Sequence, residues 1–145
     1  MEFVYIDPSV LISIVLGTPR GTQALAILDS RDSCTSEFSP VECQSGLSFH
    51  YSAAPAGLPT AEQLLSSLLS RMQMIQITPS IISDARTLVR RYRSGLGLRA
   101  LDALHIASCA QITTHLGART IEYITADRRQ HNAFTAEGFS GTLLV

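Results

Sequence analysis

The sequence predicts an α/β protein, a three-layer α/β/α sandwich around a parallel sheet of about five strands. Segments rich in β-branched and aromatic residues alternate with segments that carry helix signals, and no hairpin signal joins two strands. This order is typical of a parallel sheet covered on both faces. A length of 145 residues, 46% of them hydrophobic, is enough for one core and one domain, residues 1–145.

Each expected strand is short and ends where a turn or a helix signal begins. The first is Glu-Phe-Val-Tyr-Ile, which stops at Asp7-Pro8 and has the residue types that strands favour. The others follow the same logic along the chain. We expect strands at 2–6, near 34–36, at 74–77, at 120–124 and at 139–145.

Three of the expected helices begin with the same signal, a capping residue followed by proline: Asp7-Pro8, Ser39-Pro40 and Thr78-Pro79. Thr60 is the expected cap of a leucine-rich helix, and Gly95-Leu-Gly97 is expected to break the chain between two later helices. We expect helices at 8–16, 20–29, 39–52, 60–71, 79–93, 99–113 and 125–137, with a turn-rich loop at 54–59.

The charge of the chain is nearly balanced, with a net value of −1 and no lysine among its 11 basic residues. A strongly basic nucleic-acid surface is therefore not expected. Five of the arginines fall between residues 86 and 99. A solvated helix face and a grip on phosphate both explain such a cluster, because arginine suits either setting.

Neither a membrane segment nor a secretory signal is expected. No apolar run approaches the roughly 20 residues of a membrane span, and Asp7-Pro8 interrupts the apolar stretch at the N-terminus. The three cysteines are odd in number and form no CxxC pair. These features predict a reduced, cytoplasmic protein.

Four acids from distant parts of the chain are directed to one edge of the predicted sheet. Asp7 ends the first strand, Glu42 lies in the first turn of the helix after the second, and Asp127 follows the fourth. Asp102 begins a helix that runs back across the sheet. Ligands of open parallel sheets bind at this carboxyl edge, so we expect one site there.

Each acid also has a purely structural explanation. Asp7 is a good N-cap, and the helix dipole favours Glu42 and Asp127 in a first turn. A structural explanation fits Asp102 least well, because its segment is apolar on nearly every face and a buried carboxylate there needs a partner or a metal.

Four converging carboxylates repel one another, and Arg99 and Arg128 beside them are candidates to neutralise part of the charge. A hard divalent cation, Mg²⁺ or Mn²⁺, accepts oxygen ligands and leaves room for a phosphate. The chemistry that this arrangement predicts is hydrolysis of a phosphodiester.

The motifs around these acids resemble those of the PIN-domain family, and within it the VapC-like toxins. The four segments occur in order and together span essentially the whole chain. They are Val4-Tyr-Ile-Asp-Pro-Ser-Val-Leu-Ile12, Thr35-Ser-Glu-Phe-Ser-Pro-Val-Glu42, Leu98-Arg-Ala-Leu-Asp-Ala-Leu-His-Ile-Ala-Ser108 and Ile124-Thr-Ala-Asp127. Pro8 departs from the threonine or serine that more commonly follows the first aspartate.

The resemblance implies an Mg²⁺- or Mn²⁺-dependent endoribonuclease, the toxin of a toxin–antitoxin pair, that acts on transfer or ribosomal RNA. It further implies an antitoxin partner and a homodimer. By position, the metal-binding and catalytic acids are Asp7, Glu42, Asp102 and Asp127. Ser9 and Thr125 are auxiliary hydroxyl residues, and Arg99 and Arg128 are candidates for RNA binding. His105 is interpreted as a packed core residue, because hard Mg²⁺ prefers oxygen.

Other classes fit less well. Haloacid-dehalogenase phosphatases and receiver domains need a lysine that this chain lacks, and flap nucleases need an arch for which it has no room. The alternative that stays open is a non-catalytic PIN-like module that binds RNA or a protein.

Overall fold

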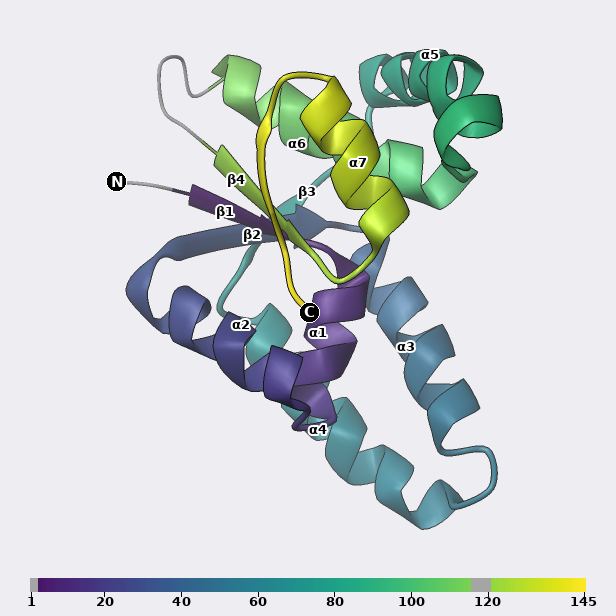
Figure 1. Ribbon diagram of the computed structural model, residues 1–145. Coiled ribbons are helices and arrows are strands. Elements are labelled where there is room, and N and C mark those ends of the chain that lie inside the picture. Colours follow the sequence, from purple (N-terminus) through teal and green to yellow (C-terminus); the bar gives the residue numbers. More distant parts are fainter. Residues whose placement is uncertain (1–2, 116–120) are drawn as a thin grey trace.

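The computed structural model describes residues 3–115 and 121–145 and has the expected three layers (Figure 1). The strands are β1 (Phe3–Ile6), β2 (Asp32–Ser36), β3 (Gln73–Ile75), β4 (Ile121–Thr125) and β5 (Ser140–Leu143). The helices are α1 (Pro8–Val15), α2 (Pro19–Ser30), α3 (Ser39–His50), the short 3₁₀ helix η1 (Pro55–Gly57), α4 (Leu58–Leu69), α5 (Pro79–Leu96), α6 (Ala100–His115) and α7 (Arg128–Ala136).

The five strands form one parallel sheet in the order β3-β2-β1-β4-β5. Strand order reverses between β1 and β4, where the chain has left one half of the sheet and entered the other. The carboxyl ends of these two strands therefore border the crevice in which parallel sheets bind ligands. The predicted fold class is confirmed.

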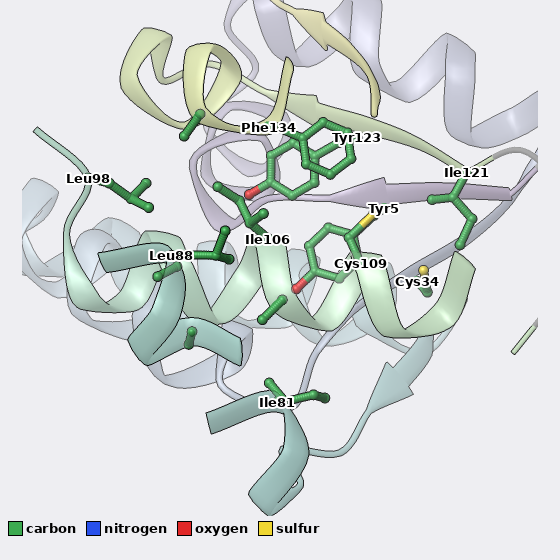
Figure 2. Packing of buried hydrophobic residues seen from close by; sticks show 14 of the residues in the cluster. Tyr5, Cys34, Ile81, Leu88, Leu98, Ile106, Cys109, Ile121, Tyr123 and Phe134 are labelled. Carbon is green, nitrogen blue, oxygen red and sulfur yellow. The ribbon is translucent and has the colours of Figure 1, made fainter. Parts of the chain in front are cut away.

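Residues of β1 alternate between two separate cores, as the two-residue period of a strand requires. Phe3 and Tyr5 pack with α5, α6 and α7, on what we call the aromatic face. Val4 and Ile6 pack with α1, α2, α3 and α4, on what we call the aliphatic face. Figure 1 shows the two helical layers on either side of the sheet, and Figure 2 shows the rings that distinguish the aromatic face.

The capping of two helices differs from expectation. Ser39 is not the N-cap of α3 but its first residue, since its hydroxyl is used by Thr35 Oγ1 at 2.6 Å and Phe38 occupies the cap. Thr60 does not cap α4, because η1 already turns the chain and leads directly into Leu58.

Two boundaries shift because a residue finds another hydrogen-bond partner. Strand β3 ends at Ile75 rather than at residue 77. The Ile77 amide donates to the Glu37 side chain, at Oε1 and 2.7 Å, and not to the backbone of a neighbouring strand. Helix α5 passes through Gly95, and Gly97, with φ +70°, closes it by donating to Arg93 O at 3.1 Å.

The C-terminal elements are also shorter than expected. Thr125 stays in β4, where its carbonyl accepts from the Leu144 amide at 2.9 Å, so α7 begins only at Arg128. Strand β5 covers 140–143 of the expected 139–145. Residue 120, the expected start of β4, lies outside the described residues.

None of the described helices is long and apolar enough to cross a membrane by itself; α1 and α2 pass this test only as a pair, and they are bent by 106°. The cysteines Cys34, Cys43 and Cys109 are free and buried, and burial raises the pKa of Cys34 and Cys43 to about 12. These thiols are therefore protonated at neutral pH.

Candidate active site

Asp7 lies at the carboxyl end of β1 and is almost completely buried, with 1% of its surface exposed. Its backbone amide extends the sheet by donating to Ile124 O at 3.0 Å. Its side chain caps α1 by accepting from the Ser9 amide at 3.1 Å. The Ser9 hydroxyl and Thr125 Oγ1, the latter at 3.3 Å, donate to the same oxygen, Oδ2. Among the described residues none donates to Oδ1.

Thr125 links Asp7 to Asp127 through its hydroxyl. Besides donating to Asp7, Thr125 Oγ1 accepts from the Asp127 amide at 3.0 Å. The Asp127 carboxylate caps α7 by accepting from the Arg129 amide at 2.8 Å. Asp7 therefore has the capping role that we considered as its structural explanation, whereas Asp127 is the N-cap of α7 and not a residue of its first turn.

Asp102 is held on both of its oxygens. Oδ2 accepts from the backbone amide of Arg99 at 3.1 Å and from the Arg99 guanidinium at 3.3 Å. Oδ1 accepts from Gln130 Nε2 at 2.9 Å. The Arg99 guanidinium also reaches Asp127 Oδ2 at 3.4 Å, so one cation bridges two of the acids.

Glu42 reaches across the carboxyl edge of the sheet from α3 to α6. Its Oε1 lies 2.6 Å from Nε2 of His105. The other ring nitrogen of His105, Nδ1, lies 2.7 Å from the hydroxyl of Tyr5. Oε2 of Glu42 has no donor among the described residues. The contact between Glu42 and His105 thus connects the two helical layers at the carboxyl edge of the sheet.

The electrostatics of the site are dominated by burial at Asp7. Burial raises the pKa of Asp7 above its ordinary value of 3.8; the charge of His105 and the hydrogen bonds of Ser9 oppose the shift, and the charge of Glu42 adds to it. A buried carboxylate of this kind is stabilised in its charged form by a nearby cation.

The donor set fits a hard divalent cation in its chemistry, because Asp7 Oδ1 and Glu42 Oε2 are carboxylate oxygens to which no residue within 3–115 or 121–145 donates. Within residues 3–115 and 121–145, however, no three Asp, Glu, His or Cys side chains are gathered closely enough to hold one metal ion. The Arg99 guanidinium is bonded to both Asp102 and Asp127. A four-carboxylate metal site therefore stays a prediction.

The candidate RNA-binding arginines differ in their surroundings. Arg99 is about half exposed and bonded to two acids, whereas Arg128 is exposed at the first position of α7. Arg91, in the arginine-rich segment, pairs instead with Glu137 at 2.7 Å. No described ion pair or hydrogen bond joins Arg86, Arg90 or Arg93 to the four acids.

Three contacts of this site were not anticipated from the sequence. Arg129, not its neighbour Arg128, forms an ion pair with Asp127, with Nε 3.6 Å from Oδ1. His105 is buried, as interpreted, but it also binds Glu42. Gln130 was not considered, although a signal for it exists. It lies on the face of α7 that buries Ala133 and Phe134, and a polar residue at such a helical spacing needs a buried partner.

The fold and the four acids at its carboxyl edge define a class of protein, and comparison with known proteins identifies it. The family model of the PIN domain matches residues 4–134, and the chain belongs to the PIN-domain family. The resemblance read from the four motifs is thereby confirmed.

The proteins to which the chain is similar include a VapC ribonuclease and VapBC proteins. The chain is 27% identical over 141 residues to Ribonuclease VapC47 of Mycobacterium tuberculosis, covering 94% of this chain and 93% of the relative. Its fold is similar to that in VapBC2 from Rickettsia felis bound to a promoter DNA fragment, with a TM-score of 0.68, 13% identity and 99% of both chains covered. It is also similar to DNA-bound VapBC from Salmonella typhimurium, with a TM-score of 0.65, 14% identity and 100% of both chains covered.

Proposed function

We propose that this chain is an Mg²⁺- or Mn²⁺-dependent endoribonuclease and the toxin of a VapBC-type toxin–antitoxin pair. The observation that carries the proposal is that Asp7, Glu42, Asp102 and Asp127 belong to one hydrogen-bonded and electrostatic network at the carboxyl edge of a PIN-domain sheet. The name of the Mycobacterium tuberculosis relative supports the ribonuclease activity.

The residues of the chain have separate tasks in this proposal. A divalent ion bound by the carboxylates supplies charge to polarise a phosphoryl oxygen and to activate a water. Ser9 and Thr125 hold Asp7 Oδ2 and so direct Oδ1 toward the site. Arg99 and Arg128 provide positive charge for the phosphates of the RNA.

The experiment is cleavage of total RNA by purified protein freed of any co-purifying partner, with Mn²⁺ or Mg²⁺ against EDTA. Asp102→Asn is expected to lower the rate at least about 100-fold, because even the loss of a residue that supports a metal ligand costs about 10- to 100-fold. Asp84→Asn, at an exposed position of α5, is the matched control and is expected to cleave like the parent chain. Metal-independent cleavage, or full activity of Asp102→Asn, contradicts the proposal.

The arginines are tested by the salt dependence of RNA binding. Arg128→Ala is expected to weaken binding of any RNA and to reduce the slope of log affinity against log salt by about 1. Arg20→Ala, at an exposed position of α2, is the control. An unchanged slope in Arg128→Ala removes that residue from the phosphate contacts.

The partners follow from the same family relation. The Rickettsia felis and Salmonella typhimurium neighbours are described as VapBC bound to DNA, and we infer an antitoxin and a homodimer for this chain in the cytoplasm. Expression of the chain alone is expected to arrest growth, whereas expression of the Asp102→Asn variant is expected to leave growth unchanged. Light scattering of the purified protein is expected to give twice the mass of one chain. If the Asp102→Asn variant still arrests growth, the toxicity does not depend on RNA cleavage.

A non-catalytic PIN-like module that binds RNA or a protein is the alternative, and one observation favours it. Arg99 pairs with Asp102 and Asp127, and Arg129 Nε lies 3.6 Å from Asp127 Oδ1, so the chain itself supplies two cations to these two acids. RNA binding that persists in EDTA, with no cleavage in either metal by folded, partner-free protein, supports this alternative over the ribonuclease.

A further inference from the structure

Two tyrosines occupy equivalent places on the two central strands of the sheet. Tyr5 of β1 and Tyr123 of β4 are register partners, and their rings stack with centroids 5.3 Å apart and planes 9° from parallel. Both are fully buried on the aromatic face, where Figure 2 shows them among Ile106, Cys109 and Phe134. Because the strands are parallel, both side chains stand at the same height in the sheet.

Each tyrosine hydroxyl meets a polar side chain that in turn meets one acid of the site, and the Tyr5 hydroxyl also has the Ser108 side chain as a hydrogen-bond neighbour. The Tyr5 hydroxyl lies 2.7 Å from His105 Nδ1, and His105 Nε2 lies 2.6 Å from Glu42 Oε1. The Tyr123 hydroxyl donates to Gln130 Oε1, and Gln130 Nε2 donates to Asp102 Oδ1 at 2.9 Å. We call these two chains of contacts the Tyr5 relay and the Tyr123 relay.

The direction of the hydrogen bonds is fixed in the Tyr123 relay. A carboxylate only accepts, so Gln130 must turn its NH₂ group toward Asp102, and its carbonyl oxygen then faces the Tyr123 hydroxyl. The flipped amide would set a carbonyl oxygen against the carboxylate. Burial raises the pKa of Tyr123 well above its ordinary value of 10.0, so the phenol keeps the proton that it donates.

The same logic applies to the Tyr5 relay. A carboxylate only accepts, so His105 Nε2 carries the hydrogen that faces Glu42 Oε1, and Nδ1 faces the Tyr5 hydroxyl. Burial likewise raises the pKa of Tyr5 well above 10.0. One oxygen of Glu42 is thereby held, and the other, Oε2, stays without a donor among the described residues.

Apolar side chains at positions 105 and 130 would be buried at a lower cost in free energy than His105 and Gln130. Each lies on a buried helix face, His105 beside Ile106 on α6 and Gln130 one turn before Phe134 on α7. Burying a polar side chain is unfavourable unless its hydrogen bonds are met, and here both ends of each side chain are used. The second hydrogen-bond partner of each side chain is an acid of the proposed site.

We infer that Tyr5 with His105, and Tyr123 with Gln130, are positioning residues that hold Glu42 and Asp102 in the orientation needed to bind the divalent ion. The inference rests on the proposed function for the roles of the two acids. Partners of metal ligands fix the orientation of the ligands, and their loss typically lowers metal affinity about 10- to 100-fold.

The first test measures Mn²⁺ affinity by calorimetry on folded protein. Gln130→Met is expected to raise the dissociation constant about 10-fold or more. Tyr123→Phe is expected to raise it by less, because Tyr123 reaches Asp102 only through Gln130. In the Tyr5 relay, His105→Leu is expected to have the effect of Gln130→Met, whereas His105→Gln keeps a donor at a similar reach and restores affinity. Tyr92→Phe is the matched control, since it removes a hydroxyl bonded to Glu137 at 2.6 Å between α5 and α7.

The second test uses NMR of metal-free protein and is independent of cleavage. The side-chain NH₂ of Gln130 and the Nε2 hydrogen of His105 are expected to be protected from solvent exchange, and Tyr123→Phe and Tyr5→Phe are expected to abolish the respective protection. Unprotected signals in the parent chain overturn the relays even if RNA is cut. Parent-like Mn²⁺ affinity in both Gln130→Met and His105→Leu also overturns the inference. Protected signals and weakened Mn²⁺ binding without RNA cleavage leave the relays standing and count against the ribonuclease alone.

Discussion

The two faces of the sheet are built from different side chains and are connected to the acids in different ways. On the aliphatic face, Val4, Ile6 and Ile124 pack against the leucines of α1–α4. On the aromatic face, Tyr5 and Tyr123 end in hydroxyls that reach His105 and Gln130, and through them Glu42 and Asp102. The aliphatic face stabilises the fold, while the aromatic face also determines how two acids are held.

The magnitudes of the interactions explain this division. Burying a leucine or isoleucine side chain contributes about 1.5–3 kcal/mol, whereas a typical hydrogen bond contributes about 0.5–1.5 kcal/mol net. The relays therefore add modestly to stability. A hydrogen bond has a direction that a leucine contact lacks, so it can orient a carboxylate.

The largest effect is expected on the aliphatic face. Leu65 on α4 is buried there, and α4 carries none of the four acids. Leu65→Ala is expected to lower the free energy of unfolding by about 2–5 kcal/mol, because it leaves a cavity. Urea denaturation measures this loss, and Mn²⁺ affinity of the remaining folded protein is expected to stay within about twofold of the parent. A parallel fall in affinity would show that the two faces are not separate.

Two glycines provide the next comparison. A Cβ on Gly21 of α2 would lie 2.1 Å from the backbone oxygen of Ser13 in α1, so Gly21→Ala must separate these helices. We expect a loss of about 1–3 kcal/mol or more in the free energy of unfolding. A Cβ on Gly95 of α5 would meet no described atom within 4 Å, and Gly95→Ala is expected to add about 0.5–1 kcal/mol. Urea denaturation measures both changes, and equal effects in the two variants would contradict the close approach of α1 and α2.

A smaller effect, of opposite sign, is expected at Asp7. Its pKa is raised by burial, so the ionised side chain lowers the stability of the metal-free protein as pH rises above the ordinary value of 3.8. Asp7→Asn removes this loss, and its carbonyl oxygen can meet the three donors that now meet Oδ2. We expect the melting temperature in EDTA at pH 7 to rise by roughly 2–6 °C, about what 1 kcal/mol gives at this size.

The pH dependence checks the cause of that rise. The gain from Asp7→Asn is expected to shrink as pH falls toward 4, where Asp7 takes up its proton in both the folded and the unfolded chain. Asp84→Asn, which changes an exposed acid, is expected to show neither the gain nor its pH dependence. A gain that is constant with pH would point to packing rather than charge.

Much of this architecture was predictable from the sequence because its signals are local. Proline after a capping residue located the starts of α1 and α5 correctly, and the alternation of strands and helices indicated the parallel sheet. The errors arose where another side chain competed for a hydrogen bond, from four positions away at Ser39 and from 40 positions away at Ile77. Ser39 is bonded to Thr35, and the Ile77 amide is taken by Glu37, a residue 40 positions away.

The site shows the same limit. The positions of Asp7 and Asp127 follow from the ends of their own strands, so sequence reasoning placed them at the carboxyl edge. The contact between His105 and Glu42 joins residues 63 positions apart, and the contact between Gln130 and Asp102 joins residues 28 apart. Which polar side chain reaches which acid depends on how α6 and α7 pack on the sheet, and no local pattern specifies that.

The finest test of the comparison is whether mutations on the two faces act independently. Leu65 and Tyr123 lie in different cores and share no described partner, so the losses of Leu65→Ala and Tyr123→Phe are expected to add within about 0.5 kcal/mol.

Tyr123→Phe and Gln130→Met, by contrast, change two residues of the same relay. Once Gln130 is gone, the Tyr123 hydroxyl has lost its acceptor, so removing the hydroxyl as well is expected to cost little more. Urea denaturation of both double-mutant cycles measures the coupling, which we expect to be at least about 0.5 kcal/mol in the second cycle. Coupling of similar size in both cycles would mean that the sheet transmits strain between its faces, and the stability core and the positioning of the acids would then be one property of the fold.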